Sequence, residues 1–191
     1  FDSIFERTIE LIRRQVENMR KIASDFSAFA GARKATPERL DLAHLVGEIV
    51  DLNAAWAREQ RIAVTVRVEP AHVWADSTEL RRVLINLVSN AFEAMPEGGA
   101  LSIELRRATS ARDRHVVLTI EDTGVGLSDT VRARLFEPYF TTRTHGTGLG
   151  LAISRRIVEE LGGTIALEPR TEGQGTIARV TLSEHFGEKV A

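Results

Sequence analysis

The stretch that decides the fold is VVLTIEDTGVG, residues 116–126, in which an apolar run ends in an Asp-x-Gly-x-Gly motif. The run predicts a strand over residues 115–121. Gly124 and Gly126 let the backbone turn sharply after it and leave space beside the Asp122 carboxylate. A carboxylate at the floor of a flat pocket can accept a hydrogen bond from an exocyclic amine, such as N6 of adenine. An ordinary Asp-Gly turn explains the same residues, so the motif alone leaves both interpretations open.

The residues after about Leu40 predict a domain of helices and strands in mixed order. The predicted helices span residues 43–59, 77–95 and 148–161, and the predicted strands span residues 62–68, 72–74, 100–107, 115–121, 164–168 and 176–182. Short turns join neighbouring strands, which favours antiparallel pairing. We therefore expect the α+β class, with a mixed, mostly antiparallel sheet covered by helices on one face.

A long amphipathic helix is predicted ahead of this domain. From Phe5 to Ala30 the apolar residues alternate in steps of four and three, the heptad spacing of a helix packed against other helices. Because one such helix is not stable alone in water, it needs partners from another chain or from an upstream segment. We expect a homodimer, although an ordinary packing helix has the same spacing. Residues 31–37 predict a linker, so we divide the chain into residues 1–35 and residues 36–191.

The composition excludes several classes of function. Of the 191 residues, 43% are hydrophobic and 27% are charged, which suits an ordinary folded core. A net charge of −2 provides no global positive field, so we expect no nucleic-acid contact and no membrane contact by this chain. The lack of cysteine excludes a disulfide, a thiolate metal site and a cysteine nucleophile. The chain starts at Phe1 rather than at a methionine, so we expect a piece of a longer protein. We expect this piece to be cytoplasmic, while the full-length protein can carry a membrane anchor.

Two asparagines are candidate ligands in the segment LINLVSNA, residues 84–91. Asn86 and Asn90 are four residues apart on a predicted helix, so both amides project from one face. An amide oxygen is a hard, neutral ligand that suits Mg²⁺ already carrying phosphate oxygens and water. Two asparagines bonded to nearby backbone are the alternative interpretation.

A third motif is THGTGLGLA, residues 144–152, which opens a predicted helix. Main-chain N–H groups in such a segment, together with the helix dipole, bind phosphate. A dinucleotide-binding fingerprint does not fit, because Leu151 stands where a third glycine is needed. A P-loop does not fit either, because no lysine occurs between Lys34 and Lys189.

An aromatic segment, LFEPYFTTR, residues 135–143, precedes the glycines. Phe136, Tyr139 and Phe140 are suited to clamp a base or to hinge a lid, and Arg143 is suited to reach a terminal phosphate. The plainer interpretation is that the aromatic side chains anchor a long loop and that Arg143 is solvated.

Together, the four segments resemble the N, G1, F and G2 boxes of the catalytic, ATP-binding domain of sensor histidine kinases. The boxes match residues 86–90, 122–126, 136–140 and 146–150, in that order. The F-box segment is similar to the nitrogen-regulation type of kinase, and the first helix is similar to the second helix of a dimerisation hairpin. The resemblance implies a Bergerat α/β sandwich with an ATP lid between Phe140 and Thr147.

The resemblance also implies a role for each matching residue. Asp122 would bind the N6 amine of adenine, and Thr176 would back the adenine pocket. Asn90 would ligate Mg²⁺ and would act with Arg143, near the γ-phosphate, as the catalytic residues. Asn86 would help at the phosphates. The other residues expected to bind ATP or ADP are Gly124, Gly126, Phe140, Thr141, Gly146, Thr147, Gly148, Leu149 and Gly150.

The implied activity is transfer of the γ-phosphate of Mg·ATP to a histidine outside this chain, for relay to the receiver domain of a response regulator. Gyrase-type and mismatch-repair ATPases place a water-activating glutamate where this chain has Asn86, which favours transfer over hydrolysis. No histidine here is followed by an acidic residue, so we expect no self-phosphorylation. Glu93 stands where many relatives carry a basic residue.

Two alternatives share the domain. An anti-sigma-type serine kinase lacks a hairpin, so the heptad helix disfavours it. A degenerate nucleotide-sensing or structural dimer module is disfavoured by the intact Asn90, Asp122 and G2-box glycines.

Overall fold

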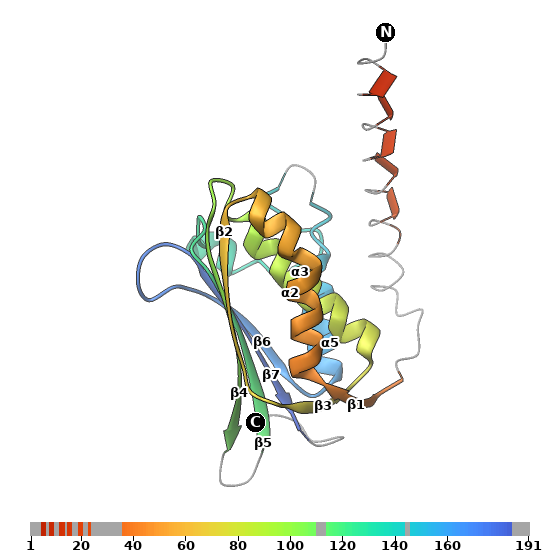
Figure 1. The fold of residues 1–191 in the computed structure, drawn as a ribbon, viewed down its shortest axis with the longest axis vertical. Coiled ribbons are helices and arrows are strands. Elements are labelled where there is room, and N and C mark those ends of the chain that lie inside the picture. The colour runs from red at the N-terminus through yellow and green to blue at the C-terminus, as the bar shows by residue number, and fades with distance from the viewer. Residues whose placement is uncertain are drawn as a thin grey trace.

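The computed structural model describes residues 36–109, 114–143 and 146–184, and a set of residues near the N-terminus that are all helical (Figure 1). That set is Phe5, Glu6, Thr8, Ile9, Ile12, Arg13, Gln15, Val16, Met19, Arg20 and Ala23. The predicted amphipathic helix is therefore helical at each of its described positions, while Phe26, Ala30 and most of the predicted linker lie outside the described residues. The division into residues 1–35 and 36–191 stays a prediction.

A five-stranded sheet forms one layer of the domain. Its strands are β2 (Ile62–Val68), β4 (Gly99–Thr109), β5 (Arg114–Asp122), β7 (Thr176–Ser183) and β6 (Thr164–Pro169), and this is also their spatial order. Strands β2 and β4 are parallel, and the other neighbours are antiparallel. The expected mixed, mostly antiparallel sheet is confirmed.

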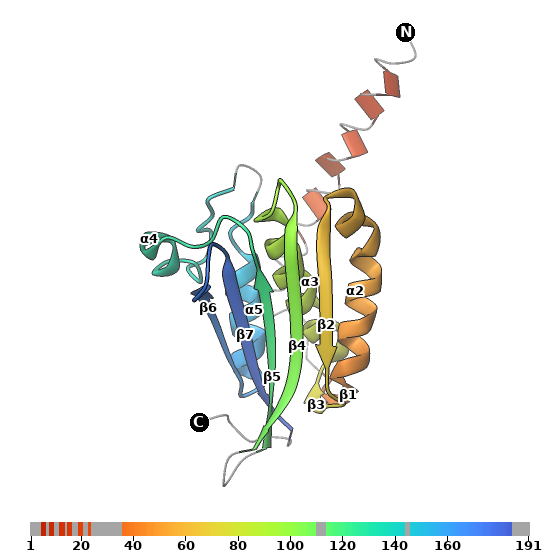
Figure 2. The ribbon, with the colours of Figure 1, turned by 60° about the vertical axis from the view of Figure 1, so that its left-hand side comes forward.

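Three helices cover one face of this sheet, as Figures 1 and 2 show. They are α2 (Leu42–Glu59), α3 (Ser77–Glu93) and α5 (Gly150–Glu160). The core lies between the two layers, where β5 contributes Val116, Leu118 and Ile120. Alternate residues of a strand face the same side, so these three point at the helices. The expected placement of helices on one face is confirmed.

Aspartates begin the two long helices. Asp41 accepts a hydrogen bond from the His44 N–H at 3.1 Å at the start of α2. Oδ1 of Asp76 accepts from the N–H groups of Thr78 and Glu79 at 2.9 and 3.2 Å at the start of α3. These bonds satisfy N–H groups that have no partner within the helix. Because α3 carries both asparagines of the predicted N box, its fixed start also fixes their position.

Two short elements were not predicted. Strand β1 (Glu38–Asp41) pairs antiparallel with β3 (His72–Ala75) beside the main sheet, and helix α4 (Asp129–Arg132) follows the Asp-x-Gly-x-Gly turn. Each has only four residues, too few for an apolar period to appear. Within the described ranges, no helix is both long and apolar enough to cross a membrane.

Candidate functional site

A cavity of about 330 Å³ lies among α3, the start of α5, the last residues of β5, the first residues of β7, and the loops that follow β5. The predicted site residues in its lining are Asn86, Asn90, Asp122, Gly126, Phe140, Thr141, Arg143, Gly146, Thr147, Gly148, Gly150 and Thr176. Much of the remaining wall is apolar, and includes Leu87, Ala91, Ile120, Leu135, Leu167 and Ala178. A mostly apolar cavity with a few polar groups is typical of small-molecule sites.

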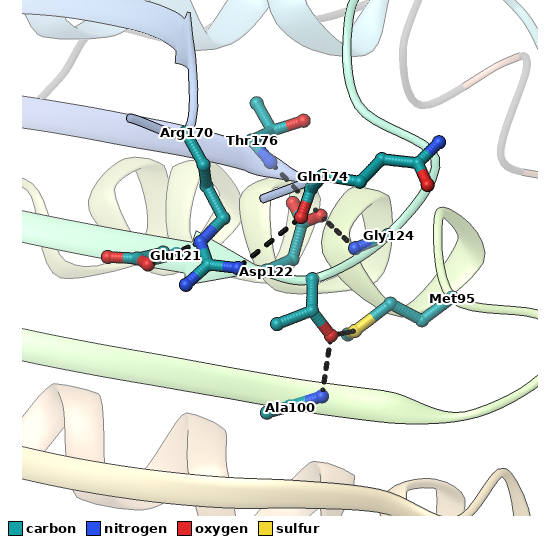
Figure 3. Close-up of polar contacts among 9 residues, drawn as sticks. Met95, Ala100, Glu121, Asp122, Gly124, Arg170, Gln174 and Thr176 are labelled. Atoms are coloured by element: carbon teal, nitrogen blue, oxygen red, sulfur yellow. Dashed lines mark hydrogen bonds and ion pairs between the residues drawn. The ribbon is translucent and has the colours of Figure 1, made fainter. Parts of the chain in front are cut away.

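Asp122 is the last residue of β5, and only 5% of it is exposed. Its Oδ1 accepts hydrogen bonds from the N–H groups of Gly124 at 2.8 Å and Thr176 at 3.3 Å (Figure 3). Both bonds end on Oδ1, which leaves Oδ2 to accept from a ligand. Burial raises the pKa of Asp122 above its ordinary value, while the two N–H groups and the charge of Arg170 oppose that rise.

Close backbone packing holds this carboxylate in place. Thr176 begins β7 and is in register with Asp122 on β5. Gly175, just before it, has φ +138°, and a Cβ there would overlap the main-chain oxygen of Asp122. A Cβ on Gly124 would overlap the main-chain oxygen of Ala94 at the end of α3. Gly124, which was expected to bind nucleotide, is not among the residues that line the cavity. It donates to Asp122 and lets the turn approach α3.

A second set of polar contacts near Asp122, made by Arg170 and Gln174, was not predicted from the sequence. Arg170 donates from Nε to Glu121 Oε1 at 2.6 Å and from Nη1 to the main-chain oxygen of Gln174 at 3.4 Å. Gln174 in turn donates from Nε2 to the main-chain oxygen of Val125 at 3.0 Å. These contacts tie the β6–β7 turn to the end of β5 and to the turn after it, and Figure 3 shows the bonds made by Arg170. The only local signal for them is the pair of glycines on either side of Gln174, which marks a tight turn.

Asn86 connects the two helices at the site. Its Nδ2 donates to the hydroxyl of Ser154 on α5 at 2.9 Å, and Ser154 is 1% exposed. Its Oδ1 lies where a Cβ on Gly150 would be. Asn86 lines the cavity, as expected, but its described hydrogen bond is to α5. This bond joins α3 to α5 at the edge of the site.

Asn90, Glu93 and Arg143 form a cluster at the mouth of the site. Arg143 donates from Nη1 to Asn90 Oδ1 at 2.7 Å and from Nη2 to the Asn90 main-chain oxygen at 3.2 Å. The same Nη1 is 2.5 Å from Glu93 Oε2, in an ion pair whose side chains are 38% and 37% exposed. Asn90 and Arg143, expected as metal ligand and phosphate contact, are thus in direct contact with each other.

The glycine segment meets the aromatic segment through its backbone. Tyr139 donates its N–H to the main-chain oxygen of Gly148 at 2.9 Å, and both residues have positive φ, of 66° each. A Cβ on Gly148 would overlap the backbone of Tyr139. The predicted helix begins at Gly150 rather than at 148, because these two residues hold the preceding backbone out of helical geometry. Thr144 and His145, within the predicted ATP lid, lie outside the described residues.

The start of α5 has the features of an anion site. No side chain caps it, so the N–H groups of its first turn have no side-chain acceptor at the N-cap position. Leu149, expected among the nucleotide-binding residues, is buried in the core and lies outside the cavity lining. Its side chain instead anchors the glycine segment to the domain.

The predicted aromatic residues lie in different settings. Phe140 lines the cavity, and the Arg134 guanidinium lies 4.5 Å from the centre of its ring. Phe136 has the Arg155 guanidinium at 5.4 Å, and Tyr139 is 62% exposed. Of the three, Phe140 is the one placed to contact a ligand, while Phe136 contacts α5.

The donor set near Asn90 suits a hard metal ion that brings further ligands with it. Within residues 36–109, 114–143 and 146–184 and the described helical positions before them, no three side chains of His, Cys, Asp or Glu gather into a metal site. The amide oxygen of Asn90 and the carboxylate of Glu93 are both hard oxygen donors, and they already hold a cationic guanidinium. The residues present therefore fit Mg²⁺ that arrives with phosphate oxygens.

Comparison with known proteins identifies relatives of this domain. Residues 75–185 match the family model described as "Histidine kinase-, DNA gyrase B-, and HSP90-like ATPase". The chain is 39% identical over 158 residues to the C4-dicarboxylate transport sensor protein DctS of Rhodobacter capsulatus, covering 78% of this chain and 23% of DctS. It is 34% identical over 183 residues to the nitrogen regulation protein NtrY of Azorhizobium caulinodans, covering 94% of this chain and 24% of NtrY. The chain thus spans about a quarter of the length of these two relatives.

Solved structures of histidine kinases have the same fold. The nucleotide-free catalytic domain of histidine kinase ThkA aligns with a TM-score of 0.70 and 32% identity, over 78% of this chain and 96% of that one. Full-length ShkA in complex with AMPPNP aligns with a TM-score of 0.76 and 25% identity, over 95% of this chain and 40% of that one. Histidine kinase ThkA in complex with response regulator protein TrrA aligns with a TM-score of 0.75 and 26% identity, over 93% of this chain and 51% of that one.

Proposed function

The chain belongs to the histidine kinase-, DNA gyrase B- and HSP90-like ATPase family, and from that premise we propose that it is the ATP-binding catalytic core of a sensor histidine kinase. In this proposal it passes the γ-phosphate of ATP to a histidine outside this chain, for relay to an aspartate of a response regulator. The similarity to sensor proteins such as DctS and NtrY supports this choice within the family.

The observation that carries the proposal is the buried Asp122 carboxylate in the cavity wall. Two main-chain N–H groups occupy Oδ1, and the other oxygen is left for a donor such as the adenine amine. Leu87, Ile120 and Ala178 supply apolar surface in the same cavity, which suits the faces of a base. We assign Thr176 to the back of this pocket, where its N–H donates to Asp122 Oδ1.

The phosphates would lie toward the start of α5 and the Asn90 cluster. We assign Gly146, Gly148 and the first turn of α5 to phosphate contacts through main-chain N–H groups. Asn90 Oδ1 would hold Mg²⁺, which supplies charge neutralisation when it is bound. Arg143 would place its positive charge at the terminal phosphate during transfer. Asn86, whose amide is bonded to Ser154, offers no base to activate water, which favours transfer over hydrolysis.

The assembly is part of the proposal. The described apolar side chains of the N-terminal helix are exposed, with Phe5 at 67% and Met19 at 70%, which supports a homodimer through this helix. The complex of ThkA with TrrA supports a response regulator as partner. The similarity to NtrY supports the nitrogen-regulation type, and a cytoplasmic location follows from the proposed use of ATP and a receiver domain.

Calorimetric titration with ADP and ATP, with and without Mg²⁺, tests the nucleotide site. We expect saturable binding by the wild type, loss of binding in Asp122→Asn, and loss of the Mg²⁺ dependence in Asn90→Ala. Glu168→Gln, on the strand β6, removes an ion pair with Arg179 and serves as the control with unchanged binding. A wild-type chain that binds neither nucleotide at millimolar concentration contradicts the proposal and favours the structural dimer module.

A test of the transfer step needs the phosphate acceptor. We expect no label on this chain incubated alone with Mg·[γ-³²P]ATP, and an acid-labile, base-stable label when a hairpin segment with a His-Glu or His-Asp pair is added in excess. Label that is stable to acid would instead indicate a serine kinase.

A further inference from the structure

The Arg143 guanidinium occupies the position next to Asn90 where a metal ion would bind. Its Nη1 is 2.7 Å from Asn90 Oδ1 and 2.5 Å from Glu93 Oε2, so one nitrogen contacts both side-chain oxygens. Asn90 and Glu93 are three residues apart on α3, which places them on one face of the helix. The two oxygens therefore converge on one cation position.

Arg143 and a metal ion cannot occupy this position together. Mg²⁺ binds its oxygen ligands at about 2.0–2.1 Å, so an ion held between Asn90 Oδ1 and Glu93 Oε2 would overlap the Arg143 nitrogen that now contacts both oxygens. Both are cations, so they also repel each other at this distance. Asn90 can then ligate Mg²⁺ only after Arg143 has left Oδ1.

We propose that Arg143 and Mg²⁺ compete for Asn90 Oδ1 and that Glu93 is the positioning residue that holds Arg143 there in the nucleotide-free chain. This inference rests on the proposed function, because it assumes that Asn90 ligates the metal. Arrival of the nucleotide with its Mg²⁺ exchanges one cation for the other. The displaced guanidinium is then free to contact a phosphate, which is its role in the proposed transfer.

The ion pair between Arg143 and Glu93 is weak enough for a metal ion to replace the guanidinium. The Arg143 and Glu93 side chains are 38% and 37% exposed, and pairs with that much solvent contact are weak. The two hydrogen bonds to Asn90, one to Oδ1 and one to the main-chain oxygen, add neutral acceptors, and their energies are also modest. A weak contact of this kind lowers the apparent affinity for the metal without preventing its binding.

A second arginine–glutamate pair on α3 provides a matched control. Arg81 on α3 is 2.6 Å from Glu48 on α2, and the two side chains are 41% and 42% exposed. This pair joins two elements, as the pair of Arg143 and Glu93 does, but neither of its residues lines the cavity. Its removal changes the same charges at a distance from Asn90.

The test is a double-mutant cycle on Mg²⁺ binding. The chain is saturated with ADP, which lacks the γ-phosphate, and the Mg²⁺ concentration at half-saturation is measured by calorimetry. We expect Arg143→Gln to lower this concentration by about three- to tenfold in the wild-type background. In the Glu93→Gln background we expect the same substitution to change it by less than about twofold, because Arg143 is no longer held on Asn90. Arg81→Gln and Glu48→Gln should leave it unchanged.

A second readout needs neither nucleotide nor metal. In the nucleotide-free chain, the side-chain amide resonance of Asn90 should shift in Arg143→Gln and in Glu93→Gln, and should stay in place in Glu48→Gln. An equal effect of Arg143→Gln in both backgrounds, or an unmoved Asn90 resonance, overturns the inference while ADP binding keeps the proposed function intact. A wild-type chain that binds no ADP overturns the proposed function and the metal competition together.

Discussion

Replacing Asp122 with asparagine should strongly weaken nucleotide binding and yet leave the domain as stable as the wild type, or more stable, at pH 7. An asparagine Oδ1 can keep both hydrogen bonds from Gly124 and Thr176. Burial raises the pKa of Asp122 above 3.8, which means that the folded chain favours the neutral side chain. Asparagine is neutral at every pH and has almost the same shape.

The pH dependence of the free energy of unfolding tests the direction of this pKa shift. Because the pKa of Asp122 is higher in the folded chain than in the unfolded one, its contribution to stability is fully present below about pH 3.8 and is lost as the pH rises through the folded pKa. The free energy of unfolding of Asp122→Asn, minus that of the wild type, should therefore increase from acid to neutral pH. Other carboxylates titrate in both proteins and cancel in this difference.

The same substitution should weaken nucleotide binding, although it keeps or raises the stability of the domain. A hydrogen bond to a charged acceptor contributes about 1.5–3 kcal/mol, and the asparagine amide would in addition turn a donor toward the adenine amine. The Kd for ADP should therefore rise by at least about ten- to 150-fold. Calorimetric titration measures the affinity, and urea unfolding between pH 4 and pH 8 measures the stability.

Asp76→Asn is the control for the same substitution at another buried aspartate. There both oxygens are used, since Oδ1 accepts from Thr78 and Glu79 and Oδ2 accepts from the Thr36 N–H at 2.9 Å. The new amide would face that N–H, so we expect a loss of about 1–3 kcal/mol of stability. The reasoning is refuted if Asp122→Asn loses as much stability as this control, or if it binds ADP like the wild type.

Two further substitutions test the packing around the site. Gly175→Ala places a Cβ against the main-chain oxygen of Asp122 at φ +138°, so urea unfolding should show a loss of about 2–4 kcal/mol, whereas Gly47→Ala, with nothing within 4 Å of its Cβ, should gain up to about 1 kcal/mol. Equal effects of the two would contradict the close contact. Asn86→Ala and Ser154→Ala should each cost about 1–3 kcal/mol, and the double variant should cost clearly less than their sum. Additive losses in thermal unfolding would mean that the bond between α3 and α5 contributes little.

The sequence predicted the elements that have a clear period. The apolar spacing of residues 77–95 predicted a helix, and the structure has it at Ser77–Glu93. The strand before Asp122 was predicted from five apolar or β-branched residues and appears as β5. Strand β1 was missed because ERLD has a single apolar residue, and its pairing with β3 is decided by the tertiary structure.

Local sequence patterns could not predict the contacts between segments that are distant in the chain. The sequence marked Glu93 as an acidic residue in a position that is basic in many relatives and suggested a phosphate role for Arg143, but nothing local joined them. The residues are 50 positions apart, and their contact depends on the path of the loop after β5. Arg170 and Gln174 were missed for the same reason, since they act by holding one turn against another.

The parallel pairing of β2 with β4 has a consequence for how the site is assembled. Helix α3 lies within the crossover, residues 69–98, that joins these two strands. Parallel neighbours need such a crossover, because a tight hairpin cannot connect them. We therefore expect Asn86 and Asn90 to reach their final positions in the same cooperative step that closes the sheet. Partial unfolding that frees α3 must also release the edge strand β2, which couples the folding of the edge to the formation of the pocket.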